Sequence, residues 1–403
     1  MILRKNIAII GAGPIGLEAG LAALDRGHRV RIFERGEAGD AVRRWGHVRM
    51  FSPFGMNVSL RGIERLKKSG QPLPDPDAML TGTEYVAQYL APLADLLGEE
   101  IIHTNAEAVA LGRCEILKHE KIADETRSET PFRLLLRRGT REWHQEADVI
   151  FDCAGTFSNP NHLGDGGIPA IGESVCKGLI SYGVADVLGR QRRLFENRRI
   201  LVVGSGHSAA SAVRDLAALK KEARETEIIW ATRRGMIPPC RMVADDPLPA
   251  REQLCMEVNK LSDSKFVDFR RDSTVLALEQ TGDGLAVTLN DYAGGDSVVV
   301  DRVIAAVGFR PDSDLARELQ THTCYATEGA YRLAATLLDE ADGESLDGPP
   351  PGIDTLRHPE PGYFTLGTKS YGRTPDFLIR HGRAQIESVL DWMEKNNGAH
   401  SKK

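Results

Sequence analysis

The sequence predicts an α/β protein of two parallel-sheet domains, the second inserted into the first, and three observations lead to this fold class. The chain has 403 residues, which is too long for one compact core and suits two or three domains. A short apolar strand runs into a glycine-rich turn twice, at Gly11–Gly16 and at Gly204–Ala209, and each turn opens a helical pattern. Short strands of a small β-meander follow each of these units, so the second unit repeats the first.

The composition is that of an ordinary soluble globular protein, with 41% hydrophobic and 27% charged residues. The formal net charge of −6 gives no global attraction to nucleic acid or to an anionic membrane. No stretch approaches the roughly 18 apolar residues of a transmembrane helix. The apolar run Ile7–Ile10 leads straight into the first glycine turn, which indicates a strand rather than a signal peptide. We therefore expect a cytoplasmic protein that binds neither nucleic acid nor membrane.

The six cysteines are scattered along the chain, and no two of them form a CxxC pair. This spacing argues against a disulfide framework, a zinc site and a dithiol redox centre alike, so the sequence predicts no metal site. The six are Cys114, Cys153, Cys176, Cys240, Cys255 and Cys324.

The first unit has the order strand, turn, helix, strand. Lys5–Ile10 is a mostly apolar strand, and the helical pattern runs from Ile15 to about Arg26. The second strand, Arg29–Phe33, ends on Glu34. An acid at that strand end, about 20 residues after the turn, completes the fingerprint of a dinucleotide-binding βαβ unit. The first domain is therefore predicted to be Rossmann-like.

Each position of this fingerprint has a physical role. Gly11 makes the tight turn, Gly13 lets the backbone approach a pyrophosphate, and Gly16 lets helix and strand pack closely. The helix N-terminus faces the phosphates, and the carboxylate of Glu34 accepts hydrogen bonds from the ribose hydroxyls. Two dinucleotides on one chain need a reason to meet, and electron transfer between them is the usual one.

An irregular loop, Trp45–Ser52, follows the first unit and contains aromatics, one arginine and small polar residues. Such a loop could lie over a flavin ring; the alternative is a packed surface loop, which the loop's residues taken alone favour. After three prolines, Thr83–Leu97 is predicted as an amphipathic helix, with Thr81 or Thr83 as its N-cap.

A small β-meander is predicted next, and a buried strand then leads out of the first domain. That strand ends on the small residues Ala154-Gly155, which let the backbone approach the first cofactor closely. Asn159-Pro160 marks the crossover to the second domain. The predicted elements are the strands Glu100–Leu111, Phe132–Arg137 and Glu142–Trp143, a hairpin loop at Lys118–Thr130, and the strand Asp148–Cys153.

The second unit consists of the strand Arg199–Val203, the helix Ser208–Ala223 and the strand Glu227–Ala231. Where an NAD-specific fold carries an acid, the end of the last strand carries Arg233 and Arg234. An arginine at that place can pair with a 2′-phosphate, so NADPH is predicted over NADH. The alternative is that both arginines lie on a solvated loop.

The rest of the chain is predicted to complete the second domain and to return to the first. The strand Val303–Val307 ends on Gly308, repeats the ending at Ala154-Gly155, and is interpreted as that return. The last strand leads to a glycine-flanked segment before a closing helix, whose backbone N–H groups suit a flavin. The remaining predicted elements are a helix near Arg251–Leu261, the strands Thr274–Glu279, Leu285–Asn290 and Ser297–Val300, a Gly/Pro-rich excursion at Ala341–Pro361, the strand Tyr363–Leu366, the segment Gly367–Arg373, a helix from Phe377 to Glu394 and a disordered tail at Asn396–Lys403.

This order of motifs resembles the two-dinucleotide-binding-domain flavoproteins, the FAD/NAD(P)H oxidoreductase superfamily of thioredoxin reductases and flavin-containing monooxygenases. The resemblance covers nearly the whole chain. The monooxygenase branch is the more similar one, on the stretches Gly204–Ala209, Trp45–Ser52 and Cys153–Pro160. The CxxC of thioredoxin reductases is missing, and the linker motif of the monooxygenases keeps only Gly178, with Tyr182 in place of its histidine.

The resemblance implies two Rossmann-like, three-layer ββα domains, with an NADPH-binding domain at 166–302 inserted into an FAD-binding domain at 1–165 and 303–403. It implies a monooxygenase in which NADPH passes hydride to flavin N5, and reduced flavin reacts with O2 to give a C4a-peroxide. The peroxide would oxygenate a nitrogen, sulfur or carbonyl centre of a small molecule, and assembly as a homo-oligomer is left open. Two alternatives remain: an NADPH-dependent reductase of a small-molecule acceptor without oxygen insertion, and a redox-sensing flavoprotein without turnover.

The loop and turn positions also give a set of expected site residues. Arg49, Ser52 and Asn57 are expected to supply polar groups near the isoalloxazine ring, and His207 is interpreted as a phosphate-side residue rather than a general base. The expected cofactor contacts are Gly11, Gly13, Pro14, Ile15, Gly16, Glu34, Arg35, Trp45, Val109, Ala154, Gly155, Gly204, Gly206, His207, Ser208, Ala209, Arg233, Arg234, Gly308, Gly367, Ser370 and Tyr371.

Overall fold

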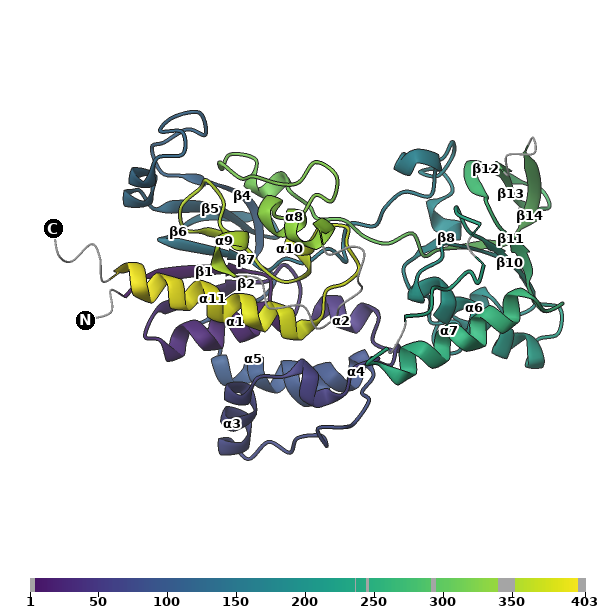
Figure 1. Ribbon diagram of the computed structural model, residues 1–403, viewed down its shortest axis with the longest axis horizontal. Helices are drawn as coiled ribbons and strands as arrows, with labels where there is room; N and C mark the ends of the chain where they lie inside the picture. The colour runs from purple at the N-terminus through teal and green to yellow at the C-terminus, as the bar shows by residue number, and fades with distance from the viewer. Residues whose placement is uncertain (1–3, 236, 244–245, 291–294, 340–351, 398–403) are drawn as a thin grey trace. The chain divides into compact units, whose positions relative to one another are not determined.

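The computed structural model describes residues 4–235, 237–243, 246–290, 295–339 and 352–397 (Figure 1). The chain divides into two compact units, and each is described here by itself. The first unit comprises Met1–Gly46, Ser52–Asn159 and Arg310–Lys403, and the second comprises His47–Phe51 and Pro160–Phe309.

The first unit is built on a five-stranded parallel sheet with the strand order β16-β7-β1-β2-β3. Its central strands are apolar along nearly their whole length, and residues such as Ile9 and Phe151 are fully buried. This pattern is expected of a parallel sheet that is covered on both faces. The strands are β1 (Asn6–Ile10), β2 (Arg29–Phe33), β3 (Ile102–His103), β7 (Val149–Asp152) and β16 (Tyr363–Thr365).

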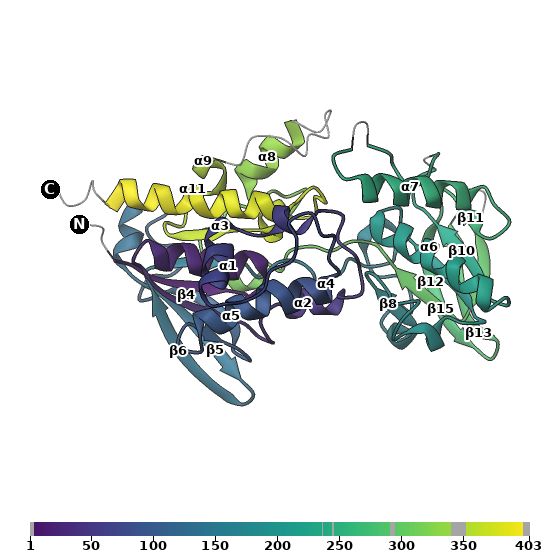
Figure 2. The same ribbon diagram turned by 90° about the horizontal axis from the view of Figure 1, so that it is seen from below.

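A three-stranded antiparallel sheet covers one face of this parallel sheet. Ile10 and Phe33 of the parallel sheet share one buried cluster with Phe132 and Leu134 of the smaller one. Helices α1 and α11 pack against each other, as both views of the ribbon show (Figure 1, Figure 2). The result is the predicted ββα layering. The smaller sheet consists of β4 (Glu107–Arg113), β5 (Phe132–Arg138) and β6 (Arg141–Ala147).

Three helical regions of the first unit were predicted, at α1, at α4 to α5 and at α11, whereas α2, α3, α8 and α9 were not. The predicted helix Thr83–Leu97 is interrupted by a π-helical turn, and Thr81 forms a capping box with Glu84 at its start. The α-helices are α1 (Pro14–Asp25), α2 (Asp40–Arg44), α3 (Leu60–Lys68), α4 (Gly82–Tyr85), α5 (Ala91–Leu97), α8 (Tyr331–Asp339), α9 (Ile353–Leu356), α10 (Thr368–Tyr371) and α11 (Ile379–Asn397); the π turn is Val86–Leu90, and 3-10 turns lie at Phe54–Asn57, Glu125–Glu129 and Asp314–Ala316.

The prediction of one meander strand over Glu100–Leu111 is wrong. The segment forms two strands in two different sheets, because β3 pairs with β2 while β4 pairs with β5. Asn105 lies between them with a φ of 53°, in the left-handed region. The backbone N–H of Ala106 then donates to the carbonyl of Glu34. This turn redirects the chain from the parallel sheet into the antiparallel one.

The second unit repeats the architecture of the first. Its five-stranded parallel sheet has the order β11-β10-β9-β15-β8, and α6 and α7 pack against each other beside it (Figure 2). The predicted meander forms a separate three-stranded sheet. The elements are β8 (Ile180–Tyr182), β9 (Arg199–Val203), β10 (Glu227–Ala231), β11 (Asp268–Arg270), β12 (Thr274–Thr281), β13 (Gly284–Asn290), β14 (Asp296–Val300), β15 (Arg302–Ala305), α6 (His207–Glu222) and α7 (Pro249–Ser262), with 3-10 turns at Asp165–Gly167, Lys177–Leu179 and Arg192–Leu194.

Strand β15 corrects the predicted point of return to the first domain. The prediction placed that return at Val303, but β15 pairs in parallel with β9 and β8 inside the second sheet. The first unit resumes at Arg310, whose backbone N–H donates to the carbonyl of Asn159. The strand was assigned to the wrong domain because a buried strand that ends in glycine fits either sheet equally well.

No helix in the described part of the chain is long and apolar enough to cross a membrane. The predicted excursion at Ala341–Pro361 falls mostly on residues 340–351, which lie outside the described ranges, as do residues 398–403 of the predicted tail. The short helix α9 lies within the predicted excursion, and the strand β16 follows it. The prediction that the disordered tail begins at Asn396 is wrong, because α11 continues to Asn397.

Candidate functional site

The sequence-predicted turns of the first unit gather at one edge of its parallel sheet. The carboxyl ends of the adjacent strands β16, β7, β1 and β2 lead to Gly367, Ala154-Gly155, Gly11 and Glu34 respectively. Ligands of doubly wound sheets bind outside this edge, where neighbouring connections leave in opposite directions. Residues that lie far apart in the sequence are thereby assembled into one candidate site.

The glycines of the first turn are required by close backbone contacts. A Cβ on Gly16 would lie 1.9 Å from the carbonyl oxygen of Gly11, and a Cβ on Gly11 would lie 2.7 Å from that of Cys153. The space at Gly13 is different, because no heavy atom of the described chain lies within 4 Å of its Cβ position. Gly13 is the N-cap of α1, and Pro14 follows it in the first turn of the helix. An open cradle at a helix N-terminus fits a pyrophosphate.

Glu34 is held beside this cradle. One of its carboxylate oxygens accepts from the backbone N–H of Ala12 at 2.8 Å, and the other accepts from that of Gly36 at 2.9 Å. A carboxylate has about four acceptor positions, so both oxygens retain capacity for ribose hydroxyls. Arg35 is exposed on the same segment.

Gly155 offers a second open surface at this edge. Its φ is +68°, and within the described ranges no heavy atom lies within 4 Å of its Cβ position. Ala154, the residue before it, is exposed although it lies only two positions after the buried strand β7. The pair therefore presents bare backbone beside the first turn, as the sequence predicts.

The C-terminal segment closes against the start of α1. A Cβ on Gly367 would lie 3.1 Å from Ile15, and Gly367 donates its N–H to Gln385 Oε1 at 2.8 Å. Ser370 is fully buried and donates its hydroxyl to the carbonyl of Gly367, and Tyr371 is stacked on a histidine ring. Ser370 and Tyr371 therefore brace this segment from within.

A buried ion pair that sequence reasoning missed ties the segment to β7. Lys369 Nζ lies 2.6 Å from the carboxylate of Asp152, which also accepts the hydroxyl of Tyr363 at 2.8 Å. All three side chains are buried. The pair fixes the Ala154-Gly155 turn relative to Gly367. An aspartate at the end of an otherwise apolar strand was the signal available in the sequence.

The predicted catalytic residues fall in both units. Ser52 Oγ donates to Asn57 Oδ1 at 3.0 Å, and both side chains are buried in a turn of the first unit. Arg49 is exposed and belongs to the second unit. Trp45 packs at the start of α4, where a Cβ on Gly82 would come within 2.8 Å of its ring. The hydrogen bonds of Ser52 and Asn57 are thus accounted for by local structure.

Val109, the remaining expected contact of the first unit, lies in β4 at an irregularity in the pairing of β4 with β5. Its side chain is half-buried. The position lies in the antiparallel sheet rather than in one of the turns at the edge of the parallel sheet.

The second unit presents an equivalent turn at the end of β9. Gly204 has a φ of +129°, and a Cβ there would lie 2.3 Å from the carbonyl oxygen of Ala306. Trp230 Nε1–H donates to the carbonyl of Gly204 at 2.7 Å and fixes the turn. Gly206 is the N-cap of α6, and its Cβ position has no heavy atom within 4 Å in the described chain. The second turn therefore offers an open helix N-terminus as well.

The residues around this turn lie on adjacent strand ends. Arg233 and Arg234 follow β10 and are exposed, and the segment is anchored where Gly235 donates its N–H to Asp272 at 2.6 Å. Gly308 follows β15 with a φ of +82°. Two further expected contacts, Ser208 and Ala209, lie in the first turn of α6, and Ala209 is buried.

The second unit also contains a cluster that sequence reasoning missed. The Sγ atoms of Cys240 and Cys255 lie 2.8 Å apart, and His207 joins them. The two cysteines are fifteen positions apart in the sequence, so a search for a CxxC pair could not find them, yet the fold brings them into contact.

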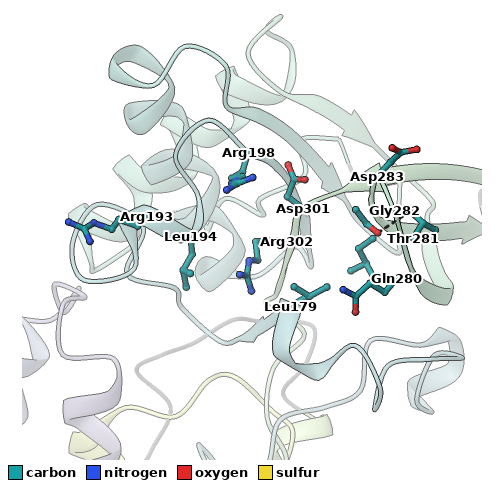
Figure 3. Close-up of a pocket in the computed structure, with 12 residues that line it drawn as sticks. Leu179, Arg193, Leu194, Arg198, Gln280, Thr281, Gly282, Asp283, Asp301 and Arg302 are labelled. Carbon is teal, nitrogen blue, oxygen red and sulfur yellow. Dashed lines mark hydrogen bonds between the residues drawn. The ribbon is translucent and has the colours of Figure 1, made fainter.

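A separate cavity of about 490 Å³ lies elsewhere in the second unit (Figure 3). Arg198 and Arg302 line it, and they stand at the start of β9 and β15. The cavity therefore lies at the amino ends of the strands, opposite the edge that carries the turn. We do not assign it to a dinucleotide, because these bind outside the carboxyl ends.

Comparison with known proteins agrees with this geometry. The family model described as pyridine nucleotide-disulphide oxidoreductase matches residues 8–332. The chain belongs to this family. It is therefore an oxidoreductase of a pyridine-nucleotide-dependent superfamily, as the turns predict. No curated protein matches the chain.

Several solved structures share the fold over nearly the whole chain. A bacillithiol disulfide reductase from Bacillus cereus has a TM-score of 0.69 at 14% identity, with 98% of this chain and 99% of that chain covered. A cadaverine monooxygenase from Erwinia amylovora, bound to FAD, has a TM-score of 0.65 at 14% identity, with 98% and 95% covered. An ornithine N-hydroxylase from Kutzneria, with reduced FAD, NADP+ and ornithine, has a TM-score of 0.64 at 14% identity, with 98% and 99% covered. At this identity the similarity shows the fold, and both reductases and monooxygenases share it.

Proposed function

We propose that this oxidoreductase binds FAD on its first unit and NADPH on its second, and that it is a monooxygenase of a small molecule. The reaction would consume NADPH, a proton and O2, and would yield NADP+, water and a substrate that carries one added oxygen atom on nitrogen, sulfur or a carbonyl carbon. The observation that supports this most is the pair of open glycine cradles, at Gly13 and Gly206, each at the carboxyl edge of its own parallel sheet.

The first unit fits FAD. The cradle at Gly13 would hold the pyrophosphate, and Glu34 would accept the ribose hydroxyls. The bare backbone at Gly155 and the braced turn at Gly367 lie beside the cradle and would contact the rest of the cofactor. When bound, FAD supplies hydride acceptance and the reaction with oxygen, which amino-acid side chains cannot provide.

The second unit fits NADPH. Gly206 opens the N-terminus of α6 for the pyrophosphate, and Arg233 and Arg234 follow the neighbouring strand, where a 2′-phosphate would lie. Both arginines are exposed, and their backbone is anchored through Gly235. The role of these residues is to bind and orient the nucleotide.

The thiol next to the first turn does not support a disulfide-reductase mechanism. Cys153 directly follows β7, and its carbonyl oxygen contacts Gly11. Burial, and to a lesser extent the neighbouring Asp152, raises the pKa of the Cys153 thiol well above its usual value. A thiol that stays protonated is a poor nucleophile. Cys153 is therefore unsuited to thiol–disulfide exchange.

A second candidate function is an NADPH-dependent reductase of a small-molecule acceptor without oxygen insertion. The same two cradles support it, and Tyr182, in place of the histidine of the monooxygenase linker motif, favours it. A redox-sensing flavoprotein without turnover is the third, and the intact second cradle speaks against it.

Oxygen balance separates these functions. The FAD-loaded protein would be given NADPH and a panel of amines, sulfides and ketones that includes ornithine, lysine and cadaverine. A monooxygenase consumes one O2 per NADPH and yields a product heavier by one oxygen atom, which 18O2 labels. Hydrogen peroxide in the full amount of NADPH consumed, with every substrate, would contradict oxygen insertion. NADPH oxidation that a quinone accelerates without oxygen uptake would establish the reductase.

A further inference from the structure

We propose that His207, Cys240 and Cys255 form a binding site for a thiophilic divalent metal ion, for which Zn²⁺ is the probe. The three residues come from three different elements of the second unit: the start of α6, the loop after β10, and α7. One potential ligand atom of each lies within 4.8 Å of the others. The binding of the metal does not depend on the function proposed above.

The donor set suits such an ion. Two sulfur atoms and an imidazole nitrogen are ligands that zinc prefers, and thiolates select soft ions over magnesium or calcium. Two thiolates balance the charge of a divalent ion, and imidazole adds none. The filled site is therefore electrically neutral, which a buried location requires.

Both cysteines are enclosed by apolar residues, where a thiolate needs a bound cation to balance its charge. Both side chains are about 2% exposed and belong to the apolar cluster beneath α6. A metal ion displaces the thiol protons when it binds.

The distances require one small adjustment. The two Sγ atoms lie 2.8 Å apart. Two zinc–sulfur bonds of about 2.3 Å at a tetrahedral angle hold their sulfurs about 3.8 Å apart. A rotation of either cysteine about its Cα–Cβ bond would supply the difference of about 1 Å.

Asn259 holds the loop cysteine against α7. Its Oδ1 accepts from the backbone N–H of Cys240, and its Nδ2 donates to the carbonyl of the same residue, both at 2.9 Å. Asn259 follows Cys255 by four positions, so the two lie on one face of the helix. This two-point contact positions Cys240 over Cys255 and is the supporting structure that a metal site requires.

The surroundings leave one side of the cluster for a fourth ligand. Phe51 packs edge-on against the His207 ring, with centroids 5.6 Å apart. Asp246, whose carboxylate interacts with His207 over a longer range, is bonded to Arg251 and to the N–H of Leu248. Because His207 is half-buried, a water molecule can complete the coordination from its exposed side.

Metal binding would connect the two parts of the proposed NADPH site. His207 begins the helix whose N-terminus is the pyrophosphate cradle, and Cys240 lies in the loop that starts with Arg233 and Arg234. A shared ion would fix that loop relative to α6. We therefore expect tighter NADPH binding in the metal-loaded protein, and this consequence does rest on the proposed function.

The test is a metal titration of the full-length protein. The protein is reduced with a phosphine, stripped with a chelator and titrated with Zn²⁺, and with Co²⁺ for its thiolate charge-transfer absorption. We expect one equivalent to bind and the melting temperature to rise with metal concentration. Loss of a residue that supports a metal ligand without binding the metal costs about 10–100-fold in metal affinity. C240S and C255S, which each remove a ligand, should lose more than that. N259A should lose about 10-fold.

Cys176→Ser is the matched control, because Cys176 is a buried cysteine of the same unit outside the cluster. It should bind metal like the wild type. Binding that persists in C255S, or no stoichiometric binding at all, would overturn the proposal. Thiol alkylation of the denatured protein, purified without reductant, gives the second readout. Four alkylated thiols instead of six, together with no metal binding either before or after reduction, would show that the pair serves as a disulfide. Metal binding with unchanged NADPH affinity would refute only the consequence for the nucleotide.

Discussion

Replacing Arg233 and Arg234 together by alanine should weaken NADPH binding about 100-fold and leave NADH binding within about twofold. A hydrogen bond to a charged group contributes about 1.5–3 kcal/mol, and because both side chains are exposed the lower value applies to each. Two such contacts give about 3 kcal/mol, which corresponds to about a 100-fold change in affinity. NADH lacks the 2′-phosphate, so it has no contact to lose.

The measurement is a titration of the FAD-loaded double variant with NADP+ and NAD+ at one fixed salt concentration. The backbone that carries both arginines is anchored through Asp272, so the substitution removes side chains without releasing the loop. Arg190→Ala is the control, because Arg190 is another exposed arginine of the same unit, on the segment that precedes β9. Equal losses for both nucleotides, or an NADPH affinity that the double variant retains, would refute this assignment of the arginines.

Three further predictions address the first unit. Gly13→Ala should fold with a melting temperature within about 2 °C of wild type. It should bind FAD at least about 10-fold more weakly, since its methyl group would occupy the open cradle. Gly16→Ala should also lose about 1–3 kcal/mol of stability, because its Cβ would meet the carbonyl oxygen of Gly11. Equal stability of the two variants by thermal unfolding would contradict the distinction. Glu360 pairs with the fully buried side chains of Arg113 and Arg127, so Glu360→Gln should cost about 3–5 kcal/mol in urea unfolding, because it leaves both guanidinium groups without their carboxylate. A loss below about 1 kcal/mol, as for an exposed ion pair, would contradict this expectation. Burial lowers the pKa of His358 from 6.5 to about 4, so between these values the unfolded chain binds a proton that the folded chain does not, and stability falls as pH falls. From pH 7 to pH 5 this group should cost wild type about 2 kcal/mol that His358→Gln does not lose, and parallel pH curves of the two proteins would contradict the shift.

The glycine turns and the strand ends were predictable because their chemistry is local. Gly16 cannot be replaced by a residue with a side chain, because a Cβ there would lie 1.9 Å from the carbonyl oxygen of Gly11. An acid at the end of the next strand follows from the same βαβ geometry. The capping box at Thr81 was readable for the same reason, because all its partners lie within four positions.

The features that the sequence did not predict depend on contacts between distant residues. Asp152 and Lys369 are 217 positions apart, and only the neighbouring positions of β7 and β16 in the sheet bring them together. The cluster of Cys240, Cys255 and His207 needs α6, α7 and a loop to be packed first. Strand β15 was assigned to the wrong domain because the residues of a strand do not determine which other strand it pairs with.

The interpretation of Ser52 and Asn57 as catalytic groups stays a prediction, and their hydrogen bonds fit a packed loop equally well. Both side chains are buried and hydrogen-bonded to each other or to the adjacent backbone. A loop of small polar residues has the same composition whether it brackets a flavin or braces a turn, so composition alone did not distinguish the two.

The central claim is that FAD on the first unit accepts hydride from NADPH on the second, and anaerobic mixing tests it most directly. The purified protein would be loaded with FAD, freed of oxygen and mixed with one equivalent of NADPH while the flavin absorbance is followed. We predict full bleaching of the flavin with NADPH, and slower bleaching at the same concentration of NADH. A protein that retains FAD, binds NADPH and yet never bleaches would contradict the account.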